Sequence, residues 1–101
     1  MPARIQGVLT AIVTPFDAAG AVCPDRLRRQ VRRQMQFGNG IFCNGTNGEF
    51  FVLNMEEKLL VTQTCVDEVA GKAPVVAHIG ENSTATTIRL GKDVAAMGVD
   101  A

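Results

Sequence analysis

A short glycine-bounded segment, Gly45-Thr46-Asn47-Gly48-Glu49, carries the residue types most suited to ligand chemistry. Glycine lets backbone N–H groups approach a ligand closely, and the hydroxyl of Thr46 and the amide of Asn47 can bind a carboxylate or relay a proton. The segment follows an apolar run, and in α/β proteins ligand sites form where strands end. A structural turn is an equal alternative, with Gly45 and Gly48 at positive φ and Thr46 hydrogen-bonded to its own backbone.

The three cysteines, Cys23, Cys43 and Cys65, are odd in number and show no C-x-x-C spacing. A disulfide framework or a structural zinc site is therefore not expected, and reduced thiols are typical of a cytoplasmic protein. The alternative is that Cys43 acts as a nucleophile, with His78, the only histidine, as its base. We interpret His78 as a neutral core residue with a local hydrogen bond rather than as a base.

Covalent catalysis through a lysine is not indicated by these 101 residues. Lys58, Lys72 and Lys92 lie in predicted helices or just after one, and the chain contains no tyrosine or tryptophan. A lysine that forms a Schiff base with a carbonyl substrate would have to reach a cavity lined by strands. None of the three is expected to do so.

Strand-like and helix-like stretches alternate along the chain and must position these residues. Apolar, β-branched runs predict strands, whereas apolar residues spaced by three or four, with caps such as Asn54 followed by Glu57, predict helices. The alternation implies a parallel sheet with right-handed crossovers. The predicted strands are 7–13, 40–44 and 74–79, the predicted helices are 24–37, 55–70 and 85–97, with Ser83 or Thr84 capping the last, and residues 99–101 begin a fourth strand. Because a natural domain rarely ends just inside a parallel strand, we expect the first part of a larger α/β protein.

The composition is ordinary for a globular protein, with 47% hydrophobic and 20% charged residues and a formal net charge of zero. No apolar run approaches the roughly eighteen residues that span a membrane. Five arginines lie within residues 26–33, but they avoid the apolar positions Leu27, Val31 and Met35, and no aromatic residue is interleaved. They are expected to form a solvated helix face paired with acidic groups of neighbouring helices, a nucleic-acid surface being the alternative.

Each of the three predicted strands is followed by or ends in a distinctive short motif. Thr14-Pro15-Phe16 ends the first predicted strand, Gly45 to Glu49 follows the second, and Ala77-His78-Ile79-Gly80 ends the third. Residues 6–101 thereby resemble the amino-terminal portion of the dihydrodipicolinate synthase / N-acetylneuraminate lyase family. The resemblance implies a (β/α)8 TIM barrel. Residues 1–101 would be the amino-terminal part of a single, incomplete barrel domain, with the first three βα units and the start of a fourth strand.

The resemblance also implies class I aldolase chemistry, in which a carbon–carbon bond is made or cleaved through a Schiff base between a lysine and pyruvate or another 2-oxo acid. Thr46 matches the family's hydroxyl in the proton relay. Asn47 stands where the family usually has a threonine that binds the carboxylate of the 2-oxo acid. Gly45 and Gly48 match the substrate-binding loop and Glu49 its frame. The family's Schiff-base lysine and catalytic tyrosine would fall beyond residue 101.

The same resemblance implies a homo-oligomer, a tetramer by family likeness. The cysteine pattern predicts a cytoplasmic protein without a structural metal. The neutral net charge and the lack of a long apolar run predict no nucleic-acid and no membrane partner, and no cofactor is expected. The chain alone is expected to be inactive, because no lysine is placed to bind a carbonyl substrate covalently. It is also expected to self-associate or stay partly unfolded, because free strand edges and an apolar interior face would meet water. Two alternatives stay open. One is a small stand-alone α/β module that binds a ligand or a partner, and the other is a regulatory or interaction fragment that uses the arginine-rich helix.

Overall fold

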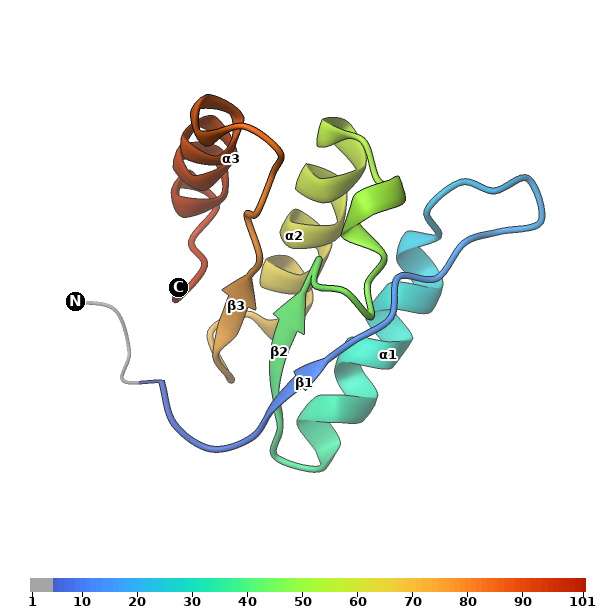
Figure 1. The fold of residues 1–101 in the computed structure, drawn as a ribbon. Helices are drawn as coiled ribbons and strands as arrows, with labels where there is room; N and C mark the ends of the chain where they lie inside the picture. Colours follow the sequence, from blue (N-terminus) through green and yellow to red (C-terminus); the bar gives the residue numbers. More distant parts are fainter. Residues whose placement is uncertain (1–4) are drawn as a thin grey trace.

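Three short parallel strands lie side by side, and a helix follows each of them (Figure 1). The structure is a computed structural model that describes residues 5–101, so the first four residues of the predicted domain lie outside the described part. The elements are β1 (Leu9–Ala11), α1 (Pro24–Gln36), β2 (Gly40–Cys43), a short 3-10 helix η1 (Phe50–Val52), α2 (Met55–Val69), β3 (Val75–Ala77) and α3 (Thr84–Ala96). The predicted order of parallel strands and helices is confirmed.

The sheet has the order β1-β2-β3, and both neighbouring pairs are parallel. Residues point alternately to the two faces of a strand, so Ile41 and Cys43 share one face and Phe42 lies on the other. Ile41 and Cys43 are fully buried, whereas Phe42 is only half-buried. The helices cover the face that holds Ile41 and Cys43, and they stand in a row in the order α1, α2, α3 (Figure 1).

One core joins the sheet to the helices. It forms because each helix turns an apolar stripe toward the strands, with residues spaced by three or four. The predicted stripe of α1 is confirmed at Leu27 and Val31, which are fully buried. The other buried apolar residues of this core include Ile12, Ile41, Cys43, Val61, Cys65, Val69, Val75, Leu90 and Val94.

The strands are shorter than the apolar runs that predicted them. The first was predicted over 7–13 and spans Leu9–Ala11, and the third was predicted over 74–79 and spans Val75–Ala77. A ladder needs a neighbour opposite each residue, and β1 pairs only with β2. Val8 and Val13 lie outside the assigned strand and expose 63% and 55% of their surface, although the Val8 carbonyl still accepts the Gly40 N–H over 2.8 Å. The apolar character of a segment therefore does not predict where its pairing with the neighbouring strand ends.

Residues 99–101 run alongside β3 without forming an assigned strand. The Asp100 N–H donates to the Val75 carbonyl over 2.9 Å, and the Ala77 N–H donates to the Ala101 carbonyl, also over 2.9 Å. The Asp100 carboxylate in addition accepts the Val75 N–H over 2.8 Å. The start of a fourth strand stays a prediction.

The helices begin where their caps predict. Asn54 and Glu57 form a reciprocal capping box at the start of α2: the Glu57 N–H donates to Asn54 Oδ1 over 2.8 Å, and the Asn54 N–H donates to Glu57 Oε1 over 2.9 Å. Ser83 caps α3 by accepting the Thr86 N–H. These caps fix the helix starts at the edge of the sheet where the strands end, beside the glycine-bounded loop.

The arginines of α1 form a mainly exposed helix face, as predicted. Arg26, Arg29, Arg32 and Arg33 are exposed and Arg28 is half-buried. Arg32 pairs with Glu68 of α2 over 3.1 Å, which confirms the predicted pairing with an acidic group of a neighbouring helix. Arg28 pairs with Asp25 of its own helix. We therefore treat this face as a solvated surface.

Candidate active site

The loop after β2 presents Thr46 and Asn47 to solvent at the carboxyl end of the strand. Thr46, Asn47 and Glu49 are exposed, whereas Gly45 and Gly48 are buried. Among the described residues, neither the Thr46 hydroxyl nor the Asn47 amide is held by another side chain. The two groups that the sequence singled out are therefore available to a ligand from outside the chain.

The backbone of this loop differs from the turn considered as an alternative. Gly45 and Gly48 do not take positive φ; the left-handed residues are Asn44 at φ 59° and Glu49 at φ 60°. Because asparagine tolerates this conformation better than most residues, Asn44 suits the bend. The glycines are needed for space instead. A Cβ at Gly45 would lie 2.6 Å from Cε1 of Phe42, and one at Gly48 would lie 3.3 Å from the backbone of Asn44.

Buried side chains fix the loop by hydrogen bonds. Asn44 is 1% exposed, and its amide donates to the Lys58 carbonyl over 3.0 Å and to Thr62 Oγ1 over 3.1 Å. Thr14, at the end of the first strand segment, donates its hydroxyl to the Gly48 carbonyl over 2.7 Å. The Glu49 N–H closes the loop onto the Thr46 carbonyl over 3.0 Å. Glu49 thus contributes to the frame through its backbone.

His78 follows β3 directly and packs among aromatic rings. Its ring centroid lies 4.6 Å from that of Phe50 and 6.4 Å from that of Phe42. The interpretation as a packed residue agrees with this half-buried position. However, Nδ1 is buried and finds no hydrogen-bond partner within residues 5–101, so the expected local hydrogen bond is not seen at that atom. Gly80 must lack a side chain, because a Cβ there would lie 2.7 Å from Cε1 of His78.

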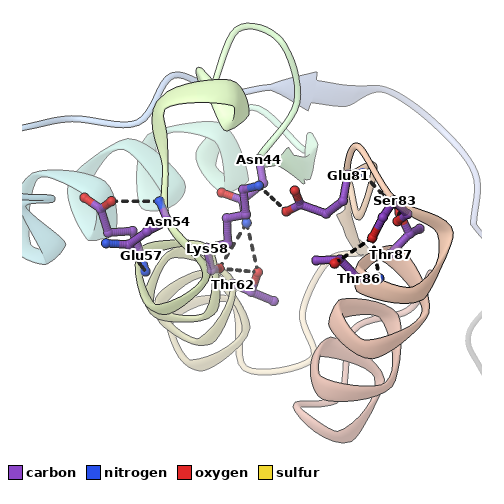
Figure 2. Close-up of polar contacts among 9 residues, drawn as sticks. All are labelled: Asn44, Asn54, Glu57, Lys58, Thr62, Glu81, Ser83, Thr86 and Thr87. Atoms are coloured by element: carbon purple, nitrogen blue, oxygen red, sulfur yellow. Dashed lines mark hydrogen bonds and ion pairs between the residues drawn. The ribbon is translucent and has the colours of Figure 1, made fainter.

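The lysines lie away from the strands, as predicted. Lys72 and Lys92 are exposed. Lys58 is buried, and its ammonium forms an ion pair with Glu81 from the loop after β3 (Figure 2). The same ammonium lies 5.6 Å from the centre of the Phe50 ring. No lysine of the chain therefore offers a free amine beside Thr46 and Asn47 in the described structure.

Sequence reasoning missed this ion pair, although one signal was present. Lys58, Val61, Cys65 and Val69 are spaced by three and four, which places the lysine on the buried stripe of α2. A lysine in such a stripe needs an anionic partner, because an isolated buried charge is costly. Nothing local identifies Glu81 as that partner, since it lies in another loop.

Cys43 and Cys65 face each other inside the core and are both fully inaccessible. The hydrogen bond with Cys43, together with burial, raises the pKa of the Cys65 thiol. A nucleophile must reach its substrate, and Cys43 cannot because the sheet and α2 enclose it. The alternative of Cys43 as a nucleophile is therefore wrong. Cys23, at the start of α1, is half-buried.

Within residues 5–101, no group of three or more histidine, cysteine, aspartate or glutamate side chains is placed to hold a metal ion. None of the helices described is both long and apolar enough to cross a bilayer.

The parallel strands, the helices along one face and the loop at the strand ends define an α/β chain. The chain superposes on the chloride-inhibited dihydrodipicolinate synthase from Acinetobacter baumannii complexed with pyruvate, with a TM-score of 0.90 and 34% identity, covering 95% of this chain and 33% of that one. Residues 4–101 match the sequence model of the dihydrodipicolinate synthetase family. The chain belongs to that family.

Named relatives fall into two groups. The chain is 35% identical over 102 aligned positions to the N-acetylneuraminate lyase of Enterobacter sp. (strain 638), covering 100% of this chain and 34% of the relative. It is 41% identical over 98 positions to the 4-hydroxy-tetrahydrodipicolinate synthase of Pseudomonas aeruginosa, covering 96% of this chain and 34% of the relative. The chain thus spans about a third of the length of these relatives.

Proposed function

We propose that residues 1–101 are the amino-terminal part of a single (β/α)8 barrel, and that the complete barrel, called the whole protein below, is a pyruvate-dependent carbon–carbon lyase or synthase. The reaction proceeds through a Schiff base between a lysine and the carbonyl carbon of a 2-oxo acid. Family membership supports this class of reaction. The whole protein acts as a cytoplasmic homo-oligomer, a tetramer by family likeness.

One observation carries the proposal: the side chains of Thr46 and Asn47 are exposed, while hydrogen bonds to buried residues fix the loop on either side of them. This loop lies at the carboxyl end of a parallel strand, where barrel enzymes place their sites. A related structure at 34% identity was solved in complex with pyruvate. Pyruvate carries a carboxylate and a carbonyl, which need a hydrogen-bond donor and a proton carrier, respectively.

Thr46 and Asn47 divide these tasks. The Asn47 amide donates a hydrogen bond to the carboxylate of the 2-oxo acid. The Thr46 hydroxyl relays a proton to or from the atoms bonded to the carbonyl carbon of that acid while the carbon–carbon bond forms or breaks. Gly45 and Gly48 keep the loop backbone close to the ligand, and Glu49 completes its frame. The Schiff-base lysine and the catalytic tyrosine come from parts of the whole protein beyond residue 101, because Lys58 is committed to Glu81 and Lys72 and Lys92 are exposed on the helix side.

Replacing Thr46 by valine in the whole protein tests this assignment. Valine keeps the shape of the side chain but cannot carry a proton, so turnover with pyruvate and its aldol partner is expected to fall on the order of 100-fold or more. The free energy of unfolding is expected to change by less than about 1 kcal/mol, because the side chain is exposed. Thr84→Val removes another exposed threonine hydroxyl, at the start of α3, and is expected to keep parental turnover. Unchanged turnover in Thr46→Val would contradict the relay.

A further inference from the structure

The Lys58–Glu81 pair is unusual for its burial. Only 5% of the Lys58 side chain and 20% of the Glu81 side chain are exposed. Removing two charges from water is costly, and the cost is offset only when the partners are held in contact. Each side chain therefore fixes the position of the other much more firmly than a surface ion pair would.

The pair joins three segments at the carboxyl edge of the sheet. Lys58 belongs to α2. Its backbone carbonyl accepts a hydrogen bond from the side-chain amide of Asn44, the residue just before the site loop. Its ammonium lies 5.6 Å from the centre of the Phe50 ring, at the end of the same loop. Glu81 comes from the loop after β3, and its N–H donates to Thr87 of α3 over 3.1 Å. Figure 2 shows Glu81 and Lys58 pointing toward each other from these neighbouring elements.

Thr46 and Asn47 lie between Asn44, which contacts the backbone carbonyl of Lys58, and Phe50, which contacts its ammonium. Asn44 is held in the left-handed conformation before them, and Phe50 is placed against the ammonium after them. Before and beside these two residues, the loop is held by Thr62, which accepts the Asn44 amide, and by Thr14, which donates to the Gly48 carbonyl. After them, Phe50 is placed against the Lys58 ammonium, and that ammonium is held by Glu81. The Lys58 side chain thus acts on the loop through Phe50.

We propose that Lys58 is a positioning residue of the active site, which, with Glu81 as its anchor, sets the geometry of Thr46 and Asn47. This inference rests on the proposed function for the chemistry that the loop performs. Lys58 takes no covalent or proton-transfer part, because its ammonium is committed to Glu81. Displacement of a reacting group by about 1 Å can lower a rate on the order of 100-fold, so a loosened loop is expected to affect catalysis strongly.

Four variants of the whole protein separate positioning from plain stability. Lys58→Met removes the charge and keeps the length of the side chain, and Lys58→Arg keeps the charge. Lys58→Met combined with Glu81→Leu removes both charges, and a buried ion pair can often be replaced by apolar residues without loss of stability. Arg28→Met is the matched control, because its pair with Asp25 lies on the exposed face of α1.

Two readouts are used. For pyruvate, kcat/KM of Lys58→Met and of the double variant is expected to fall on the order of 100-fold, with a rise in KM as well as a fall in kcat, because Asn47 and Thr46 both move. A variant that merely unfolds more easily loses active molecules and thus apparent kcat at unchanged KM. Amide hydrogen exchange of residues 45–53 is expected to speed up about tenfold or more. Lys58→Arg and Arg28→Met are expected to stay near the parent in both readouts.

A folded double variant with parental kcat/KM and parental exchange over residues 45–53 would overturn the inference. Amide hydrogen exchange also tests the positioning role of Lys58 independently of the proposed function. If the parent turned over no 2-oxo acid, the proposed function would fail, while faster exchange of the site loop in the double variant would still support the positioning role of Lys58, and unchanged exchange would still refute it.

Discussion

The side chains of Thr46 and Asn47 are available to bind a ligand because other residues stabilise the conformation of their loop. The bend is made by Asn44 in the left-handed conformation, and the Gly48 carbonyl is bonded by Thr14. A buried hydrogen bond of this kind is worth about 1 kcal/mol, and leaving the carbonyl without it would cost more. The side chains of Thr46 and Asn47 are thereby free of structural hydrogen bonds among the described residues.

Asn47 is expected to recognise the carboxylate of the 2-oxo acid. In the whole protein, Asn47→Ala should raise KM for pyruvate by about tenfold or more, because a hydrogen bond to a charged group contributes about 1.5–3 kcal/mol. Asn47→Thr keeps a hydrogen-bond donor and should bind pyruvate nearly as well as the parent. Steady-state kinetics with pyruvate as the varied substrate measures both.

The control for Asn47 is Gln36→Ala, which removes an exposed amide at the carboxyl end of α1 and should leave KM unchanged. If Asn47→Ala raised only the KM of the second substrate, Asn47 would belong to the site of that substrate instead.

At the residue scale the sequence singled out Thr46 and Asn47 and left two interpretations of the glycines, a close approach of the backbone to a ligand and a structural turn with positive φ. The structure excludes positive φ at Gly45 and Gly48, and a Cβ at either position would crowd the Phe42 ring or the Asn44 backbone. Those neighbours are defined only after the strand and the loop have folded together. The pairing of Lys58 with Glu81, residues 23 positions apart, is hidden for the same reason.

Whole elements were easier to predict, and the helices easiest. Their ends are fixed by local signals: Pro24 in the first turn of α1, the capping box at Asn54 and the glycines that follow each helix. The strand ends were predicted less well, because a strand stops where its neighbour stops and not where its apolar run ends. The predicted burial of one helix face follows from periodicity alone, and Leu27 and Val31 obey it.

The capping box of α2 stands immediately after the site loop, so its removal should weaken the element that holds the loop. In the whole protein, Asn54→Ala is expected to lower the free energy of unfolding by about 1 kcal/mol, because the Glu57 N–H loses its acceptor. Asn54→Ser keeps an acceptor and should lose at most a few tenths of that amount. Urea denaturation followed by circular dichroism measures the change. Equal stability of Asn54→Ala and the parent would show that the box contributes nothing.

On the scale of the whole molecule, the described residues form a three-stranded sheet with one covered face. The sheet has helices on one face only, and on the other face Phe42 remains half-buried (Figure 1). Val8 and Val13 are exposed at the edge strand β1. Open strand edges and uncovered apolar side chains favour association with further protein, which agrees with the proposal that a closed barrel completes the fold.

The central claim is that the whole protein binds pyruvate as a Schiff base on a lysine outside residues 1–101 while Thr46 and Asn47 hold and activate it. Treatment of the whole protein with pyruvate and sodium borohydride, followed by peptide mass spectrometry, tests this most directly, because borohydride reduces the imine to a stable secondary amine. The predicted result is one reduced pyruvate adduct per chain, on a lysine beyond residue 101, with Lys58, Lys72 and Lys92 unmodified and no adduct on the isolated 101-residue chain. Absence of any adduct on the whole protein, or an adduct on one of those three lysines, would contradict the account.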